Sequence, residues 1–403
     1  MMNKIPKGWE VKKLGEICEK ISAGGDKPAE FSPIKTNDFK IPIYSNGIKD
    51  NGLYGYTKYA TINKQAVTVS ARGTIGFVCV RNEPFCPIVR LISAIPKDNI
   101  LDLKFLAYAL KFKIPSGEGS SIPQLTVPNF KQLEITLPPL SEQKAIADKL
   151  DDSFAKIENA ITNLINAKEN LKLYKQSVLK SAFNGDLLPN TSPTHWEVKK
   201  LGEIISKEKY SMKRGPFGSA LKKEFFVDNG IRVFEQYNPI NSDPHWKRYF
   251  ITKEKFKELE AFKASAGDLL ISCSGTLGKI LELPKNTEIG VINQALLKIK
   301  LDQKQILNSF FIHYFNSNKF QNLILEKTIG TAIKNIASVS ELKQLEIPLP
   351  NLTEQNLIVA EIDRRFAIVD KTLNLIDKSI QNAKNLKQSI LKKAFSGELR
   401  SEI

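Results

Sequence analysis

Residues 131–143 read KQLEITLPPLSEQ, and residues 343–355 read KQLEIPLPNLTEQ. The match continues without a gap to two similar endings, KQSVLKSAFNGDL (175–187) and KQSILKKAFSGEL (387–399). A second repeat opens each half of the chain, because WEVKKLGEI occurs unchanged at 9–17 and at 196–204. Matches this long show that the chain is a tandem duplication, and such a repeat sets the architecture before any single motif does.

Between these shared ends the two copies are barely alignable. The opening repeat recurs at an offset of 187 residues and the later repeat at an offset of 212, so the copies differ by 25 residues in between. Short echoes survive there, such as GTIG (73–76) against GTLG (275–278). Different middles between matching ends suggest one task performed twice on different targets.

Each middle region mixes strand-like and short helical runs, which is typical of an α/β (α+β) globule. The expected strands are residues 41–44, 66–70, 231–234 and 268–272, and the expected short helices are residues 101–112 and 306–316. We therefore predict two globules in tandem, each followed by a long α-helix. The predicted parts are a first globule (1–140), a first helix with a linker (141–190), a second globule (191–350) and a second helix (351–403).

A heptad pattern of apolar residues runs through each closing segment. The a and d positions are Leu150, Phe154, Ile157, Ile161, Leu164 and Leu171 in the first copy, and Ile362, Phe366, Val369, Leu373, Ile376 and Ile380 in the second. A seam sustained over several heptads is typical of a coiled coil. Ser/Thr-Glu-Gln runs start both helices, and Gly185 and Gly397 end them. The alternative is that each helix packs separately on its own globule.

Each closing segment is long enough to hold two globules apart. About 43 residues at ~1.5 Å per residue make a rod of roughly 65 Å. We predict that the two helices pair as an antiparallel coiled coil, with pseudo-two-fold symmetry between the copies. Two DNA-binding globules on such a rod can reach half-sites about one helical turn, ~34 Å, apart.

The chain is basic, with 59 Lys and Arg against 43 Asp and Glu and a net charge of +16. Such an excess favours a polyanionic partner, most often nucleic acid, although a lysine-rich solvated surface is the plain alternative. Residues 1–140 and 188–352 each carry a net charge of +7, whereas residues 141–187 are neutral and residues 353–399 carry +2. We therefore expect DNA on the globules and protein partners on the helices.

The sequence lacks the features of several other protein classes. No apolar run approaches the ~18 residues of a membrane span, and the first residues contain no signal-peptide core. The four cysteines have no CxxC spacing, so we expect no disulfide framework, no metal site and a cytoplasmic location. The common nucleotide-binding, hydrolase and metalloprotease motifs are absent, so we expect no catalytic residue.

Polar turns that follow strands are the first candidates for DNA contact. Tyr44-Ser-Asn46-Gly and Phe234-Glu-Gln236-Tyr237-Asn238 place amides at corresponding points of the two copies. Asn and Gln can pair bidentately with adenine in the major groove. The alternative is an ordinary strand-to-turn junction, which Asn-Gly favours in any case.

Glycine turns and basic stretches supply the remaining candidates. The turns at 70–74 and 272–276 let a backbone approach a phosphate, although structural glycines explain them equally well. Charged loops are also often only solvated. The candidate side chains in these segments are Tyr56, Lys58, Arg72, Thr74, Lys213, Arg214, Ser219, Lys247, Arg248, Ser274 and Thr276.

This organisation resembles the specificity (S, HsdS) subunit of type I restriction–modification systems, over essentially the whole chain. The resemblance rests on WEVKKLGEI opening each half, on LPPLSEQ (137–143) and LPNLTEQ (349–355), and on the endings AFNGDL (182–187) and AFSGEL (394–399). The specific part is the order of two globules and two helices, since each motif alone is weak.

The resemblance implies that each globule is a target-recognition domain reading one half of a bipartite, asymmetric sequence in double-stranded DNA. It implies that the helices fix the spacer and dock two methyltransferase (M) subunits, joined by two restriction (R) subunits. The cofactors S-adenosylmethionine, ATP and magnesium would then belong to those partners, and this chain would bind none. The alternative function is a stand-alone DNA-binding regulator or architectural protein.

Overall fold

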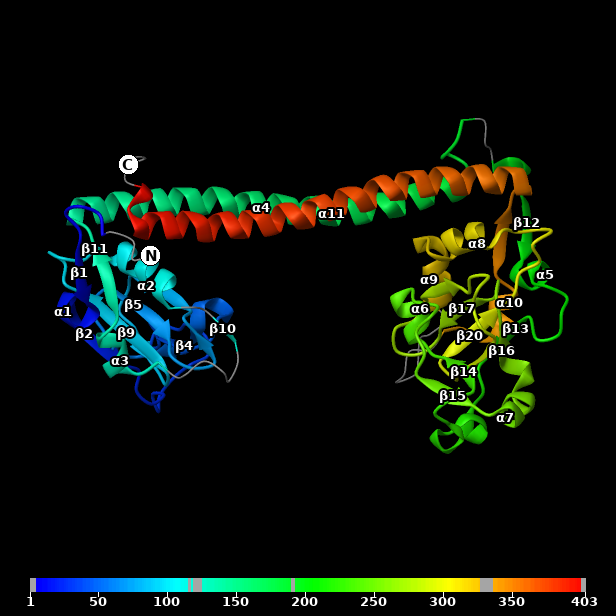
Figure 1. Ribbon diagram of the computed structural model, residues 1–403, viewed down its shortest axis with the longest axis horizontal. Helices are drawn as coiled ribbons and strands as arrows, with labels where there is room; N and C mark the ends of the chain where they lie inside the picture. The colour runs from blue at the N-terminus through cyan, green and yellow to red at the C-terminus, as the bar shows by residue number, and fades with distance from the viewer. Residues whose placement is uncertain (1–4, 115–116, 119–124, 190–192, 327–335, 400–403) are drawn as a thin grey trace. The chain divides into compact units, whose positions relative to one another are not determined.

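The computed structural model describes residues 5–114, 117–118, 125–189, 193–326 and 336–399 (Figure 1). The chain divides into two compact units. Unit 1 contains residues 1–165 and 377–403, and unit 2 contains residues 166–376. Both long helices therefore contribute to both units, and each unit holds one globule.

Two small sheets form the globule of unit 1. The four-stranded sheet has the order β2 (Cys18–Ala23), β9 (Leu91–Pro96), β5 (Ala66–Ser70) and β7 (Val78–Arg81), all antiparallel. The three-stranded sheet has the order β4 (Leu53–Thr57), β3 (Ile41–Tyr44) and β8 (Cys86–Pro87). A short ribbon pairs β6 (Thr74–Ile75) with β10 (Gly117–Glu118), and α2 (Leu103–Lys113) covers the larger sheet. β5 and β9 read as unbroken buried runs because both of their faces are covered.

The globule of unit 2 repeats this plan with two four-stranded sheets. The first has the order β13 (Met212–Arg214), β20 (Leu296–Ile299), β17 (Leu269–Ser272) and β18 (Ile280–Glu282). The second has the order β15 (Tyr249–Ile251), β14 (Ile231–Phe234), β19 (Gly290–Ile292) and β16 (Lys263–Ala264). Its helices are α6 (Tyr237–Asn241), α7 (Lys253–Glu258), α8 (Asn308–Phe315), α9 (Asn318–Glu326) and α10 (Val339–Lys343).

The repeated motifs at the ends of each globule contact each other. The opening motif forms β1 (Glu10–Lys13) and α1 (Leu14–Ile17), and β1 pairs with β11 (Glu134–Leu137), which follows α3 (Val127–Lys131). In unit 2, β12 (Glu197–Lys200) and α5 (Leu201–Ile204) are placed in the same way, and β12 pairs with β21 (Glu346–Leu349). The Trp9 indole donates to Glu142 at 3.0 Å, and the Trp196 indole donates to Glu354 at 2.8 Å. The identical sequences are therefore the joints between globule and helix.

A buried glutamine fastens the start of each long helix, α4 (Leu140–Phe183) and α11 (Leu352–Ser396). Gln143 is 0% exposed; its amide donates to the carbonyls of Pro138 and Ile100, and its oxygen accepts from the Asp102 amide. Gln355 makes the same three bonds in unit 2. Buried polar groups persist only when such partners satisfy them, which explains why both copies keep this residue.

The two long helices lie against each other, antiparallel, within each unit (Figure 1). In unit 1, Lys387 pairs with Glu158, and Ala394 shares a core with Leu150. Later residues of α11 thus lie beside earlier residues of α4, so the two helices run in opposite directions. In unit 2, Lys175 pairs with Asp370, while Ile362 shares a core with Val178. All twelve predicted seam side chains are buried or half-buried. The predicted antiparallel coiled coil is confirmed.

The closing motif of each copy packs in the unit that holds the other copy's globule. Phe395 of α11 contacts the Phe105 ring of α2 at 5.3 Å in unit 1. Phe183 of α4 contacts Phe310 of α8 at 5.4 Å in unit 2. Each helix therefore packs on a globule and on the other helix, and the alternative of two separate helices is wrong.

The expected elements lie where the sequence placed them. β3, β5 and β14 have the predicted bounds, β17 differs from its bounds by one residue at one end, and α2 and α8 differ by one or two residues at both ends. Both long helices begin one residue earlier than their Ser/Thr-Glu-Gln runs, and each ends one or two residues before a glycine with positive φ, Gly185 or Gly397. In the part of the chain that the structure describes, no helix combines the length and apolar character needed to cross a bilayer.

Candidate nucleic-acid interface

Four segments of the first globule meet at one end of its sheets. We call this surface loop end 1; it comprises the residues that follow β2 (24–26), β3 (44–47) and β5 (70–74) and those that precede β9 (88–90). Main-chain hydrogen bonds join them. Gly24 donates to the Leu91 carbonyl, Ile88 to the Tyr44 carbonyl and Ala71 to the Arg90 carbonyl.

The second globule has the same junction. Loop end 2 comprises residues 215–217, 234–237, 272–276 and 293–295, which follow β13, β14 and β17 and precede β20. Gly215 donates to the Leu296 carbonyl, Asn293 to the Phe234 carbonyl and Cys273 to the Ala295 carbonyl. These three bonds are the counterparts of the three in loop end 1. The two globules thus share a main-chain frame at a place where only a few residues, such as Gly73-Thr74 and Gly275-Thr276, match in sequence.

A glycine without room for a side chain lies in each frame. A Cβ on Gly24 would stand 2.5 Å from the Ile88 carbonyl oxygen, and one on Gly215 would stand 1.8 Å from that of Asn293. Both glycines therefore permit a close approach of two backbones. This contact holds the loops after β2 and β13 tightly against the loops before β9 and β20.

Most of the exposed side chains carried by this common frame differ. Loop end 1 exposes Arg72, Val89 and Arg90, and the neighbouring turn exposes Lys49. Loop end 2 exposes Phe217 (68%), Tyr237 (42%), Thr276 and Gln294. Positive charge, amides and aromatic rings are the groups that contact phosphates and bases. A constant frame with different polar groups suits the recognition of two different sequences.

The structure brings together four of the residues predicted in the first globule. The Asn46 carbonyl accepts from the hydroxyls of Ser70 and Thr74, and its amide donates to the Arg72 carbonyl at 2.8 Å. Asn46 therefore orients the turn that exposes Arg72, instead of presenting a free amide. The Tyr44 ring lies beneath the Arg81 guanidinium, 3.6 Å away, so its role is also structural.

Two further predicted residues of this globule lie elsewhere. Tyr56 of β4 pairs with Pro42, at the end of β3 opposite to Tyr44. Lys58 follows β4 and lies at that same end. Lys58 forms an ion pair with Glu30. Strand β4 runs antiparallel to β3, so it carries these side chains away from loop end 1.

In the second globule the prediction for Asn238 is wrong. Asn238 is 0% exposed; its amide group donates to the Asp243 and Trp246 carbonyls, and its oxygen accepts from the Glu235 amide. It closes the turn that follows β14 and offers nothing to a base. Gln236 points its oxygen inward, where no partner among the described residues satisfies it. Tyr237 remains exposed and stacks on Trp246, with centroids 4.3 Å apart.

Buried groups next to loop end 2 are also incompletely satisfied. One oxygen of Glu235 is buried without a partner among the described residues, and burial raises the pKa of this carboxyl. The Arg232 guanidinium is buried over the Phe234 ring, and burial lowers its pKa. Unsatisfied polar groups are costly in a fold and concentrate at functional places.

The other predicted residues of the second globule are distributed around this end. Arg248 lies over Tyr249, which β15 places opposite Val233 near loop end 2, and Lys247 forms an ion pair with Glu288. Arg214 lies over Phe217, whereas Lys213 lies over Tyr210 and Phe262. Ser274 and Thr276 belong to the turn after β17. The side chain of Ser219 falls outside the described residues.

Sequence reasoning missed the loop before β9 and β20, which carries Arg90 and Gln294. No motif marks it, because the two copies read PIVRL (87–91) and INQAL (292–296). Only an alignment of the following buried strands, β9 and β20, shows that the two loops correspond; in it Arg90 is equivalent to Ala295, and Gln294 is equivalent to Val89.

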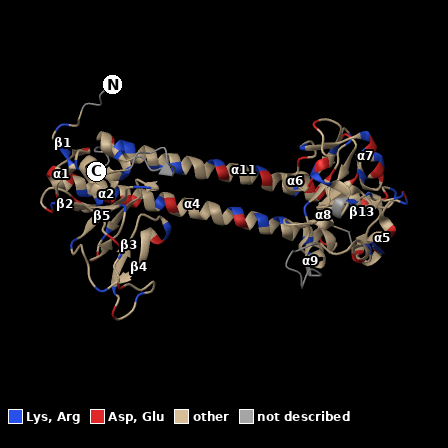
Figure 2. Cartoon of the chain, turned by 90° about the horizontal axis from the view of Figure 1, so that it is seen from below, with Lys and Arg blue, Asp and Glu red and all other residues tan. Residues whose placement is uncertain are grey.

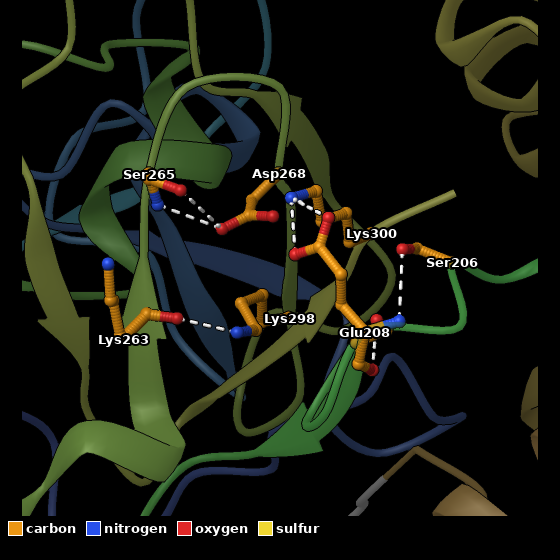
Figure 3. Close-up of polar contacts among 8 residues, drawn as sticks. Ser206, Glu208, Lys263, Ser265, Asp268, Lys298 and Lys300 are labelled. Carbon is orange, nitrogen blue, oxygen red and sulfur yellow. Dashed lines mark hydrogen bonds and ion pairs between the residues drawn. The ribbon is translucent and has the colours of Figure 1, made fainter. Parts of the chain in front are cut away.

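A polar cleft of about 510 Å³ lies at the opposite end of β17 and β20 (Figure 3). Ser265 donates to one oxygen of Asp268, Lys298 donates to the Lys263 carbonyl at 2.6 Å, and Lys300 pairs with Glu208. Burial raises the pKa of Asp268 and lowers the pKa of Lys298. The strand positions equivalent to Asp268 and Lys298 in the first globule are Ala66 and Ser93, so this cleft is specific to the second.

Charges of both signs alternate along the long helices (Figure 2). Among the residues that the structure describes, no group of three or more His, Cys, Asp or Glu side chains is placed to hold a metal ion.

Comparison with known proteins identifies the family. The type I restriction modification DNA specificity domain matches residues 6–167 and again residues 193–383. The chain belongs to this family. The two matches coincide with the two copies of the duplication, and each contains one loop end and one long-helix segment.

Named relatives agree over different lengths. The putative type I specificity subunit S.MpnORF89P of Mycoplasma pneumoniae is 43% identical over 143 residues, which cover 36% of this chain and 42% of that protein. The StySPI specificity subunit of Salmonella potsdam is 23% identical over 99% of this chain and 91% of its own length. The EcoKI specificity subunit of Escherichia coli is 24% identical over the same shares.

Solved structures show the same fold. A chain described under complex assembly and conformational transition of the type I R-M system has a TM-score of 0.71 and 18% identity, and the match covers 97% of this chain and 98% of that one. The HsdS subunit of Thermoanaerobacter tengcongensis has a TM-score of 0.57 and 19% identity, with 98% of both chains covered.

Proposed function

We propose that this chain selects the DNA target of a type I restriction–modification complex, with each globule reading one half of a bipartite sequence. The observation that carries the proposal is the pair of loop ends. They repeat the same main-chain hydrogen bonds and expose mostly different side chains. A duplicated reader of this kind recognises two different half-sites in a fixed order.

In this proposal the paired helices set the spacer and dock two methyltransferase and two restriction subunits. Three features support that assignment: the near neutrality of the helices, their mixed surface charge and their rigid attachment by Gln143 and Gln355. The chain itself binds no cofactor and performs no chemistry. S-adenosylmethionine, ATP and magnesium act on the partner subunits, which also extrude the target adenine.

The deciding experiment maps methylated adenines across the genome of a host that carries this chain with its methyltransferase subunit. We expect a single asymmetric motif of two short half-sites separated by an unread spacer of constant length. Methylation that ignores the presence of this chain would overturn the proposal. Tight sequence-specific binding that needs no methyltransferase and directs no methylation would instead favour a stand-alone DNA-binding regulator or architectural protein.

A further inference from the structure

The loops that precede β9 and β20 hold equivalent places in the two globules. Residues 88–90 lie between the turn after β5 and the loop after β2, and residues 293–295 lie between the turn after β17 and the loop after β13. Each loop thus occupies the centre of its loop end, between the segments that follow the neighbouring strands.

Main-chain contacts hold each loop on both sides. In globule 1, Ile88 donates to Tyr44 on one side, and the Arg90 carbonyl accepts from Ala71 at 2.9 Å on the other. In globule 2, Asn293 donates to Phe234, and the Ala295 carbonyl accepts from Cys273 at 2.8 Å. A side chain on so fixed a backbone loses little further freedom on binding, which favours selective contacts.

Arg90 departs from ordinary backbone geometry. Its φ is +69°, in the left-handed region that non-glycine residues rarely adopt. Such a conformation is energetically unfavourable and is retained where the surrounding structure imposes it, often at functional places. The surrounding structure here is the bond from Ala71 and the close approach of Gly24.

The two loops present different side chains to solvent. Arg90 and Gln294 are both exposed. Neither side chain has a hydrogen-bond or ion-pair partner among the described residues. By contrast, the neighbouring amides of Asn46 and Asn238 already donate to backbone carbonyls. The side chains in these two loops are therefore available for a ligand, whereas the neighbouring amides are engaged.

We propose that these loops are the base-reading elements, with Arg90 reading a guanine in one half-site and Gln294 reading an adenine in the other. The proposal rests on the function proposed above. A guanidinium pairs bidentately with O6 and N7 of guanine, and a carboxamide pairs with N6 and N7 of adenine, both in the major groove. Arg72, one turn away, contacts the phosphate backbone beside the guanine.

Selection from random duplex DNA by the full-length chain with its methyltransferase subunit tests this assignment. The first variant is Arg90→Gly, since glycine accepts the left-handed φ and leaves the loop intact. We expect it to lose about 10- to 100-fold of discrimination at one guanine of one half-site, because a bidentate contact is worth that much. The second variant, Gln294→Ala, should lose the preference for adenine at one position of the other half-site only.

Lys58→Ala is the matched control for the lost charge. Lys58 is exposed at the far end of β3, so its removal should leave every base preference unchanged. Unfolding temperatures of Gln294→Ala and Lys58→Ala should match that of the unaltered chain, and that of Arg90→Gly should be no lower.

Several results would overturn the reading assignment. They are unchanged base preferences in Arg90→Gly and Gln294→Ala, a uniform loss of DNA affinity without altered base preference, or a loss of preference at a base other than the guanine or adenine assigned. Each of these leaves the bipartite selection by the unaltered chain in place. Failure of the proposed function is a separate outcome, in which the unaltered chain selects no bipartite sequence.

Discussion

Replacing Gln143 by leucine tests how the first globule is fixed to its helix. The substitution keeps a side chain of similar volume but removes three hydrogen bonds of 2.8–2.9 Å to Pro138, Ile100 and Asp102. The site is fully buried, so water cannot replace the lost partners. Each orphaned group costs about 1–3 kcal/mol, and the added apolar burial returns about 1–2 kcal/mol. We expect unit 1 to lose between about 1 and 8 kcal/mol of unfolding free energy.

Denaturant unfolding combined with amide hydrogen exchange measures this effect. The Asp102 amide donates to Gln143, so its exchange should accelerate, while the Leu307 amide of unit 2 keeps its protection. Gln355→Leu should produce the mirror-image result. Gln132→Leu, at an exposed position of unit 1, serves as the control and should cost less than about 0.5 kcal/mol. A loss below about 1 kcal/mol in Gln143→Leu, or unchanged exchange at Asp102, would refute the buried-clamp argument.

Three other predictions follow from the same structure. Gly24→Ala should destabilise unit 1 by about 1–3 kcal/mol in denaturant unfolding because its Cβ meets the Ile88 carbonyl, whereas Gly25→Ala, with open space around it, should cost almost nothing. Burial lowers the pKa of His313 despite its bond to Asp363, so unit 2 should lose unfolding free energy as the pH falls below the unfolded pKa of about 6.5. His313→Tyr should remove this pH dependence of stability, and a variant with an unchanged pH profile would contradict the assignment to His313. Inserting one heptad into both long helices should change the methylated motif's spacer but neither half-site, and altered half-sites would contradict the helices' role as the spacer.

The choice of tyrosine for the His313 variant comes from the duplication itself. Tyr108 of α2 donates to Asp151 of α4, and its ring packs edge-on against Phe154. His313 of α8 contacts Asp363 of α11, and its ring packs edge-on against Phe366. Evolution has therefore already placed a tyrosine in the equivalent joint, so the variant should fold.

Much of the architecture could be predicted because it depends on local patterns. A heptad seam specifies a coiled coil through side-chain spacing alone, and the repeated motifs mark the joints because the same contacts recur in both units. Even so, the sequence did not show which contacts each repeated motif makes. Trp9 and Glu142 are 133 residues apart, and only the fold shows that the first donates to the second.

The candidate site was predicted less well, for a physical reason. Asn238, in the short helix α6 that follows β14, and Gln294, in the turn before β20, are both amides beside strands, and composition does not distinguish them. The fold buries the first to close its own turn and exposes the second on a rigid loop. Whether a polar side chain hydrogen-bonds to the backbone or remains available for a ligand depends on which backbone carbonyls lie within hydrogen-bond distance. The fold decides this, and the residue type does not.

The duplication, the charge distribution and the heptad seam were determined by the sequence alone, since repetition and periodicity are properties of the chain. They indicated two basic globules on two long helices. Only the tertiary structure decided which side chains those globules present. The loop ends are assembled from four separated segments through main-chain hydrogen bonds, and such bonds leave no trace in the identity of the residues that make them.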